Sequence, residues 1–318
     1  MNICILDGYT LNPGDLSWNK IKELGDCKIY DRTAPEEIAE RAADAEIVLT
    51  NKVVLDARQI ERLPELKYIG VLATGYNVVD LEAARKRGIA VTNIPAYSTM
   101  SVAQMIFAHL LNVTNRVAHY AADVDSGKWE NCADFCFYDT PLTELSGKTM
   151  GIVGLGNTGM ATAKIALAFG MKVIAKTSKT ADQLPDGITP ADFDTLLAES
   201  DVISLNCPLT ESTRGLIDSK AIAKTKRSAI LINTGRGPLV NESDLAEALN
   251  SGRIAAFCAD VLSSEPPSPQ NPLLHAKNSH ITPHIAWATV EARKRLMEIA
   301  AGNIREFIEG KPLTNKIV

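Results

Sequence analysis

Short apolar runs alternate with segments of helical period over the first hundred residues. Residues between the runs carry apolar side chains at helical spacing, and Gly, Asn, Asp or Pro punctuates most of the runs. Fully apolar strands separated by amphipathic helices are typical of a parallel sheet covered on both faces. The pattern therefore predicts one α/β domain whose strands lie near residues 2–7, 27–31, 46–51, 66–73 and 89–94.

From about Ser98 the pattern changes to a long helical one. Residues 99–127 (TMSVAQMIFAHLLNVTNRVAHYAADVDSG) place apolar side chains at helical spacing and end in glycine. This combination predicts one continuous helix that links two lobes.

A second alternating series follows the linking segment, and an amphipathic helical pattern at residues 289–310 closes the chain. We predict two doubly wound parallel-sheet domains with an α/β fold. The last helix is expected to return to the first lobe, so that residues 1–98 plus 288–318 form one discontinuous domain and residues 99–287 the other. The six predicted strands of the second domain lie near 149–156, 172–177, 202–208, 229–235, 254–261 and 279–285.

Composition narrows the class of protein. The 318 residues suit two domains, and no apolar run approaches the roughly 20 residues that span a bilayer. The net charge of −5 is spread over interspersed acids and bases, so neither nucleic acid nor membrane is an expected partner. The N-terminus lacks the features of a signal peptide and the six cysteines are scattered, which favours the cytoplasm. Cys132 and Cys136 have no second pair nearby, and we expect no metal site.

The strand near 149–156 ends in GLGNTG, a dinucleotide-binding pattern. Gly154 allows a tight turn, Gly156 lets backbone N–H groups approach a pyrophosphate, and Gly159 lets helix and strand pack closely. Asn157 and Thr158 open the helix whose N-terminus faces the anion. We therefore expect a nicotinamide dinucleotide at this turn.

The end of the next strand lacks the acidic residue that usually binds the ribose hydroxyls. Thr177 occupies about that place, flanked by Lys176, Ser178 and Lys179. These side chains can donate hydrogen bonds to a 2′-phosphate, which an acid would repel. They favour tolerance of NADP, and the alternative is that Thr177 meets the ribose of NAD while its neighbours are solvated.

Three residues that follow later strands suit the reduction of a 2-keto acid. Hydride addition to a carbonyl leaves negative charge on oxygen, which requires a proton donor and a positive clamp. His284 can donate the proton, and Arg236 can hold the carbonyl and carboxylate with its planar fork. Glu265 is placed to pair with the histidine and to favour its protonated form. Taken singly, each residue could be an ordinary loop or turn residue.

Several motifs in the sequence resemble those of a known family. The motifs GLGNTG, NTGRGPLVNE, ADVLSSEP and TPHIAWATVEARKRL resemble those of the D-isomer-specific 2-hydroxyacid dehydrogenases, and the likeness covers essentially the whole chain. ILDGYTLNPGDLSW and FCFYDTPLTELSGKT are most similar to the glycerate dehydrogenase (hydroxypyruvate reductase) branch. The resemblance implies a flavodoxin-like substrate domain and a Rossmann dinucleotide-binding domain with a cleft between them that closes by hinge motion. It also implies a homodimer built largely through the linking helix.

The resemblance implies roles for further residues. Arg236, Glu265 and His284 become the substrate-binding arginine, the acid paired to histidine and the general acid/base. Most NAD-using members of the family carry aspartate where this sequence has Thr177, so the resemblance does not imply which coenzyme the protein uses. The remaining implied contacts are Lys52, Thr74, Gly75, Tyr76 and Trp287 for the substrate, and Thr99, Cys207, Pro208, Thr213, Thr234 and Asp260 for the cofactor.

We therefore expect an NADP- or NAD-dependent oxidoreductase that interconverts a small 2-keto acid and a D-2-hydroxy acid, most simply hydroxypyruvate or glyoxylate and the matching hydroxy acid. One alternative is the same mechanism on pyruvate or phenylpyruvate. Another is a dinucleotide-sensing binding protein without enzymatic activity, since the family also contains transcriptional corepressors.

Overall fold

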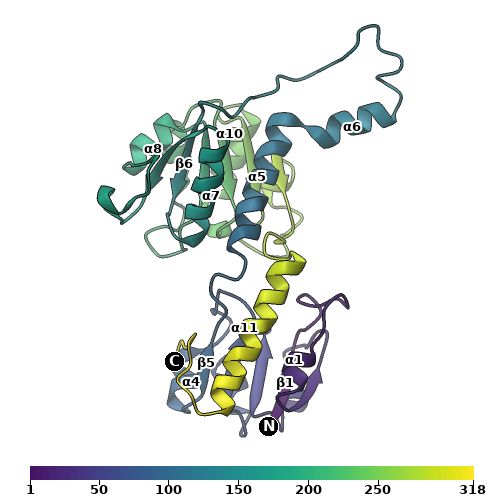
Figure 1. The fold of residues 1–318 in the computed structure, drawn as a ribbon, viewed down its shortest axis with the longest axis vertical. Helices are drawn as coiled ribbons and strands as arrows, with labels where there is room; N and C mark the ends of the chain where they lie inside the picture. Colours follow the sequence, from purple (N-terminus) through teal and green to yellow (C-terminus); the bar gives the residue numbers. More distant parts are fainter. The chain divides into compact units, whose positions relative to one another are not determined.

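The computed structural model describes residues 1–318, which fold into two compact units (Figure 1). Unit 1 comprises Met1–Ser98 and Trp287–Val318, and unit 2 comprises Thr99–Ala286. Trp287, which the sequence pattern placed at the end of the second domain, lies in unit 1. The chain therefore leaves unit 1 once, builds unit 2 from a single stretch, and returns.

Unit 1 is built on a five-stranded parallel sheet with the order β2-β1-β3-β4-β5. This is the flavodoxin-like order, in which the chain reverses direction across the sheet between β1 and β3. All five strands predicted from the sequence are present. They are β1 (Asn2–Ile5), β2 (Asp26–Ile29), β3 (Ile47–Thr50), β4 (Tyr68–Val71) and β5 (Ala90–Thr92).

Helices cover both faces of this sheet, as the apolar strands require. One face packs against α2, α3 and α4, and the other against α1 and α11. β3 and β4 are buried along their whole length, because they lie inside the sheet and under both helix layers. The helices are α1 (Asn19–Lys22), α2 (Ile38–Arg41), α3 (Ala57–Glu61), α4 (Leu81–Lys86) and α11 (Val290–Ile308).

Unit 2 contains a seven-stranded parallel sheet with the order β12-β11-β10-β9-β6-β7-β8. Counted from β6, its first six strands follow the Rossmann order 3-2-1-4-5-6, and β12 extends one edge. The strands are β6 (Thr149–Val153), β7 (Lys172–Lys176), β8 (Ile188–Pro190), β9 (Val202–Leu205), β10 (Ile230–Asn233), β11 (Ala256–Ala259) and β12 (Ser279–Ile281).

The sequence pattern predicted six of these seven strands and missed β8. This strand has three residues, ends in Pro190, and pairs only with β7 at the edge of the sheet. Only Ile188 among its residues is buried, so no apolar run marks it. Its existence depends on pairing with β7, which local sequence does not report.

Two layers of helices enclose the sheet of unit 2. α5 and α7 pack against one face, and α8, α9 and α10 against the other. The bounds are α5 (Thr99–Asn115), α6 (Val117–Asp125), α7 (Asn157–Ala168), α8 (Phe193–Glu199), α9 (Ser219–Lys224) and α10 (Glu242–Asn250). No helix of the chain combines the length and the apolar character needed to cross a lipid bilayer.

The continuous helix predicted for residues 99–127 is wrong, because it breaks at Arg116. This residue adopts a left-handed conformation with φ of 50°, which separates α5 from α6. α5 buries residues such as Ile106 and Leu110, whereas α6 buries none. The break therefore marks the point at which packing against the sheet of unit 2 ends. Helical periodicity continues across the break, so the pattern alone did not reveal it.

Arg293 ties α11 to the loop that follows β1. Its guanidinium is buried and donates hydrogen bonds to both carboxylate oxygens of Asp15, at 2.7 and 2.5 Å, and to the carbonyl oxygen of Leu11 at 3.0 Å. The hydrogen bond from Arg293 holds the pKa of the Asp15 carboxyl below its usual range. The Asp15 side chain remains 44% exposed, so water screens the pair.

This ion pair gives unit 1 a predictable sensitivity to acid. A carboxyl whose pKa is lower in the folded than in the unfolded chain stabilises the fold above its unfolded pKa of about 4, and that stabilisation is lost as the pH falls through the folded pKa. The difference in urea midpoint between the parent protein and Asp15→Asn should therefore shrink between about pH 6 and about pH 3. A difference that stays constant over this range would contradict the prediction.

Candidate active site

The glycine turn after β6 has the geometry that a dinucleotide requires. A Cβ atom at Gly154 would lie 2.7 Å from the backbone nitrogen of Cys207, and Gly154 has φ of 94°. A Cβ at Gly159 would lie 2.1 Å from the carbonyl oxygen of Gly154, so the helix and strand pack too closely for any side chain. A Cβ at Gly156 would meet nothing within 4 Å. Two glycines therefore serve packing, and the third keeps an open approach to the backbone.

The start of α7 offers unsatisfied donors beside that open space. Gly156 is the N-cap residue and supplies no side-chain hydrogen bond, and no acidic residue lies in the first turn. The first backbone N–H groups of a helix lack partners within the helix and carry partial positive charge. Asn157 and Thr158 open this helix, as the sequence predicted. An anionic phosphate group is the ligand that such a terminus binds best.

Two buried polar atoms lack partners at the ends of neighbouring strands. They are Asn206 Oδ1, directly after β9, and Thr234 Oγ1, directly after β10. Buried polar atoms without a partner are rare in folded proteins, and a bound ligand is one explanation. The two atoms and the three glycines fit a dinucleotide across the carboxyl edge of this sheet. The sequence did not reveal Asn206, and the residues expected at this position were its neighbours Cys207 and Pro208.

The segment after Asn206 forms a tight loop. The Thr213 hydroxyl donates a hydrogen bond to the carbonyl oxygen of Pro208 at 2.8 Å and accepts one from the N–H of Thr210 at 2.7 Å. Thr213, which the family resemblance assigned to the cofactor, therefore closes this loop. Burial raises the pKa of the Cys207 thiol, so that this side chain is an uncharged part of the wall.

The end of β7 has the polar, cationic character that the sequence indicated. Lys176 is the last residue of β7 and is exposed, as are Ser178 and Lys179. The Thr177 hydroxyl accepts a hydrogen bond from the backbone N–H of Lys179 at 3.2 Å. The next acidic residue, Asp182, lies in the short 3₁₀ helix Ala181–Gln183.

Arg236 follows β10 in a loop that Asn233 organises. The side chain of Asn233 donates to the carbonyl oxygen of Arg236 at 2.9 Å and accepts from the N–H of Gly235 at 3.1 Å. Arg236 itself is exposed, and its guanidinium donates to the carbonyl oxygen of Gly235 at 2.8 Å. The structure thus presents the fork of the arginine at the carboxyl edge of the sheet. Asn233 is a positioning residue that the sequence did not reveal, because it reads as the last residue of a strand.

Glu265 and His284 meet at the same edge of the sheet. Nδ1 of His284 lies 2.5 Å from Oε2 of Glu265, and Oε1 of Glu265 accepts a hydrogen bond from the N–H of Leu262 at 3.2 Å. The two side chains are 30% and 36% exposed, so they form a pair that a substrate can reach. Because a carboxylate only accepts, Nδ1 carries the proton shared with Glu265, and Nε2 is the ring nitrogen that does not face this carboxylate. His284 holds this place with φ of 54°, unusual for a residue with a side chain.

Asp260 lies beside the loop of His284, and Thr99 begins α5. Asp260 follows β11, is 1% exposed, and accepts hydrogen bonds from the backbone N–H groups of Ile285 and Ala286 at 2.9 and 2.7 Å. Thr99 is the first residue of α5. The carboxylate that was expected to meet the cofactor therefore anchors the backbone directly after His284.

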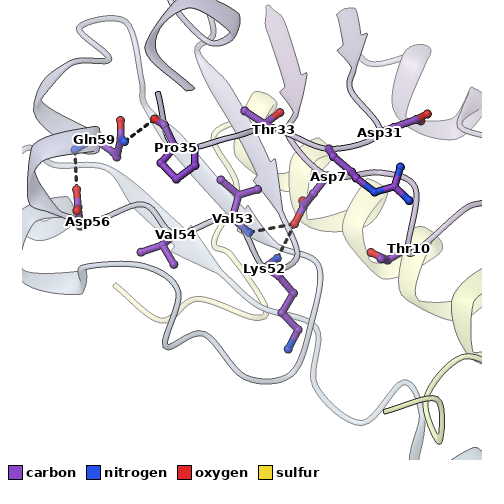
Figure 2. Close-up of a pocket in the computed structure, with 11 residues that line it drawn as sticks. Asp7, Thr10, Asp31, Thr33, Pro35, Lys52, Val53, Val54, Asp56 and Gln59 are labelled. Atoms are coloured by element: carbon purple, nitrogen blue, oxygen red, sulfur yellow. Dashed lines mark hydrogen bonds between the residues drawn. The ribbon is translucent and has the colours of Figure 1, made fainter. Parts of the chain in front are cut away.

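Unit 1 contains the expected substrate residues at the carboxyl ends of β3 and β4. The buried carboxylate of Asp7 accepts hydrogen bonds from the N–H groups of Lys52 and Val53 at 2.6 and 3.1 Å (Figure 2). It also accepts one from the N–H of Asn51 at 2.8 Å. This leaves the Lys52 side chain exposed at the rim of a cavity of about 490 Å³. The Thr74 hydroxyl donates to the carbonyl oxygen of Ile94 at 2.9 Å.

The other residues of unit 1 that were expected to meet the substrate lie in the same loop as Thr74 or at the start of the returning segment. Tyr76 is exposed, and Gly75 is half-buried. Trp287 packs edge-on against Tyr97, with ring centroids 6.5 Å apart.

The cavity beside Lys52 does not include Thr74, Gly75 or Tyr76. Its lining residues are Asp7, Thr10, Asp31, Arg32, Thr33, Pro35, Lys52, Val53, Val54, Asp56 and Gln59.

Taken together, the Rossmann sheet, the open glycine turn and the histidine–carboxylate pair define a nicotinamide-dependent oxidoreductase. Comparison with known proteins agrees. Residues 107–286 match the family model "D-isomer specific 2-hydroxyacid dehydrogenase, NAD binding domain". Hydroxypyruvate reductase of Blautia hydrogenotrophica is 50% identical over 317 residues, with 98% of each chain covered. The chain belongs to the D-isomer specific 2-hydroxyacid dehydrogenase family.

Two solved structures show the same fold over the whole chain. D-lactate dehydrogenase of Lactobacillus jensenii with NAD⁺ is 30% identical with a TM-score of 0.83, and the acyclic imino acid reductase Bsp5 with NADPH and D-Arg is 31% identical with a TM-score of 0.85. In both cases the match covers 100% of each chain. The expectation of an enzyme with a nicotinamide cofactor is confirmed, which sets aside the sensor without activity.

The different roles of the glycines lead to a paired prediction. Gly156→Ala should leave the melting temperature within about 2 °C of the parent, since its methyl group meets nothing, yet weaken nicotinamide dinucleotide binding at least about tenfold by obstructing the phosphate. Gly159→Ala should lower stability by about 2 kcal/mol or more, because the new atom overlaps the backbone of Gly154. Calorimetric melting and fluorescence titration measure the two effects. Equal loss of stability in both variants would contradict this division of roles.

Proposed function

We propose that the protein reduces hydroxypyruvate to D-glycerate and catalyses the reverse oxidation, with His284 as general acid/base. The observation that carries the proposal is the 2.5 Å contact between His284 and Glu265 at the carboxyl edge of the nucleotide-binding sheet. A histidine oriented by a carboxylate can give a proton to a carbonyl oxygen and recover it from the alcohol.

The residues divide the work of the reaction. The bound nicotinamide supplies or accepts the hydride. His284 delivers the proton from Nε2, while Glu265 holds the imidazole through Nδ1 and stabilises the cation that forms when the alcohol is oxidised. Arg236 offers a planar fork that can bind the carbonyl oxygen and the carboxylate of the keto acid. It is suited to this role because its side chain is exposed and its guanidinium donates to the neutral carbonyl oxygen of Gly235, which leaves its charge available to an anionic substrate.

Residues of unit 1 complete the proposed substrate contacts. Thr74, Gly75 and Tyr76 offer backbone N–H groups to the substrate carboxylate, and Lys52 contributes positive charge. Asp7 supports this role of Lys52, since it fixes the backbone of residues 51–53 through three hydrogen bonds. Trp287 is proposed to limit the size of the substrate at the mouth of the site.

The choice of hydroxypyruvate rests on similarity rather than on pocket geometry. The 50% identity over nearly the whole chain is to a hydroxypyruvate reductase, whereas the D-lactate dehydrogenase of Lactobacillus jensenii is 30% identical. Rates with hydroxypyruvate, glyoxylate, pyruvate and phenylpyruvate at equal enzyme concentration decide among them. A larger kcat/KM for pyruvate or phenylpyruvate would replace the proposed substrate and retain the mechanism.

The assignment of the acid/base residue predicts a graded loss of turnover. His284→Ala should lower kcat for hydroxypyruvate reduction by about 10³-fold or more, because it removes the proton donor, and leave the dissociation constant of the cofactor within about threefold. Glu265→Gln should lower kcat less, by about 10- to 100-fold, because it only loosens the orientation of the imidazole. Steady-state kinetics and cofactor titration separate the effects. Undiminished turnover in His284→Ala would refute the proposed function.

We propose that NADP is accepted, with NAD as the alternative coenzyme. Support comes from the exposed Lys176, Ser178 and Lys179 and from the hydroxyl of Thr177 in place of an acid. Thr177→Asp should raise the ratio of kcat/KM for NADH to that for NADPH by at least about tenfold, since a carboxylate repels the 2′-phosphate. Thr177→Asn is the matched control without charge, and it should shift the ratio much less. A ratio that does not respond to the aspartate would rule out contact between this strand end and the 2′-position.

We propose a homodimer that involves α6 and the segment after it. In Figure 1 these residues extend away from the sheet of unit 2, and α6 buries no residue. The apolar side chains of Val117, Phe135 and Tyr138 are 69%, 90% and 73% exposed, a density of exposed apolar surface typical of an interface. Sedimentation at micromolar concentration should give the mass of two chains, and Phe135→Asp should shift the protein toward one chain. A parent protein that sediments as a single chain would refute the dimer.

A further inference from the structure

A chain of part-buried hydrogen bonds runs from α5 to the loop that carries His284. The hydroxyl of Thr282 donates to Oδ1 of Asp260 at 2.6 Å, and Nε2 of His109 lies 3.1 Å from the same hydroxyl oxygen. His109 and Asp260 are 5% and 1% exposed. All three residues belong to unit 2. Neither His109 nor Thr282 has a role in the proposed reaction so far.

The direction of each hydrogen bond follows from what each group can donate. The carboxylate of Asp260 only accepts, so the single proton of the Thr282 hydroxyl points to it. The oxygen of Thr282 must then accept from His109, which requires the tautomer with a proton on Nε2. Burial lowers the pKa of His109, against the opposing effect of Asp260, and so favours the neutral ring that has this tautomer.

At the other end of this series of hydrogen bonds, Asp260 binds the backbone next to His284. Oδ1 of Asp260 accepts from the N–H of Ile285 at 2.9 Å, and Oδ2 accepts from the N–H of Ala286 at 2.7 Å. The N–H of His284 itself donates to the carbonyl oxygen of Thr282 at 3.0 Å. The residues on both sides of His284 are thus tied to one buried carboxylate.

Such restraint is needed because His284 has φ of 54°. A residue with a Cβ atom leaves this conformation unless its surroundings hold it there. Relaxation of the backbone would swing Nδ1 away from Glu265 and Nε2 away from the reacting carbonyl. A shift of about 1 Å in a catalytic group can lower a rate by about 100-fold.

We propose that His109 and Thr282 are positioning residues for the reaction, acting through Asp260 to hold His284 in its active orientation. The inference rests on the proposed function of His284 as acid/base. It gives His109, a helix residue about 170 positions away in sequence, a part in catalysis without contact with substrate or cofactor. The competing explanation is that the hydrogen bonds only anchor α5 to the sheet.

Thr282→Val tests the central link, since it removes the hydroxyl and keeps the shape of the side chain. We expect kcat to fall about 10- to 100-fold, with the cofactor dissociation constant and the number of cofactor sites per chain unchanged. The primary isotope effect on kcat, measured with coenzyme deuterated at the transferred position, should rise, because the chemical step becomes slower than product release. Thr282→Ser restores the hydroxyl and should keep kcat within about threefold of the parent.

His109 provides a second probe that leaves every donor to Asp260 in place. His109→Leu should lower kcat in the same direction but less than Thr282→Val, whereas His109→Gln, whose amide N–H can replace Nε2, should retain most of it. The double variant His109→Leu/Thr282→Val should be no slower than Thr282→Val alone, because both changes break one chain. These variants also decide the matter if Thr282→Val does not fold.

Thr225→Val is the matched control for loss of a buried hydroxyl. Thr225 is 7% exposed, its hydroxyl donates to the carbonyl oxygen of Ile222 at 2.9 Å, and it precedes β10 at the opposite edge of the sheet. The Thr225→Val variant should be less stable than the parent protein. At a temperature where all variants are folded, it should keep the parent kcat and isotope effect.

The outcomes separate the two proposals. If Thr282→Val and His109→Leu keep the parent kcat and isotope effect, the hydrogen bonds between His109, Thr282 and Asp260 only anchor α5. The inference is then wrong, even when His284→Ala is inactive. If His284→Ala retains turnover, the proposed function fails first. A slow Thr282→Val that Thr282→Ser rescues, beside an inactive His284→Ala, supports both.

Discussion

Every strand in both sheets runs parallel to its neighbours, and this constraint determines where the chemistry lies. Parallel strands bring all their carboxyl ends to one edge, so residues far apart in sequence meet there. Arg236, Glu265 and His284 follow three successive strands, β10, β11 and β12, and reach the same edge of unit 2. The glycine turn after β6 and the orphaned oxygens after β9 and β10 lie along it as well. The proposed catalytic and cofactor residues are neighbours because a parallel sheet brings the carboxyl ends of its strands to one edge.

Buried carboxylates hold the loops at these edges in shape. Asp260 accepts hydrogen bonds from a hydroxyl and two backbone N–H groups beside His284, and Asp7 accepts three from the loop that carries Lys52. Loop backbone that leaves a sheet has polar groups without strand partners, and a charged acceptor satisfies several of them at once. The two units thus use the same device, once beside the proposed proton donor and once beside the proposed substrate residues.

The sequence predicted most of the fold but few of the residues that position the proposed site. Apolar runs of strand length located eleven of the twelve strands, since a strand buried on both faces must be apolar throughout. β8 was missed because edge pairing, and no apolar run, creates it. The bend at Arg116 was missed because helical periodicity continues past the point where packing stops. Asn206, Asn233 and His109 were missed because a polar residue inside or after a strand or helix has no local signature of the partner it will meet.

What the sequence determined by itself is the set of chemical groups and their order along the chain. A glycine turn after an apolar strand, followed by an arginine, a glutamate and a histidine after later strands, already restricts the chemistry to a dinucleotide and a proton transfer beside a positive clamp. Only the tertiary structure decided which nitrogen of His284 faces Glu265, that its backbone is left-handed, and that a hydrogen-bonded chain from α5 reaches the carboxylate beside it. The reason is physical. Residue type sets what a group can donate or accept, whereas direction and distance come from packing between elements that lie more than a hundred residues apart.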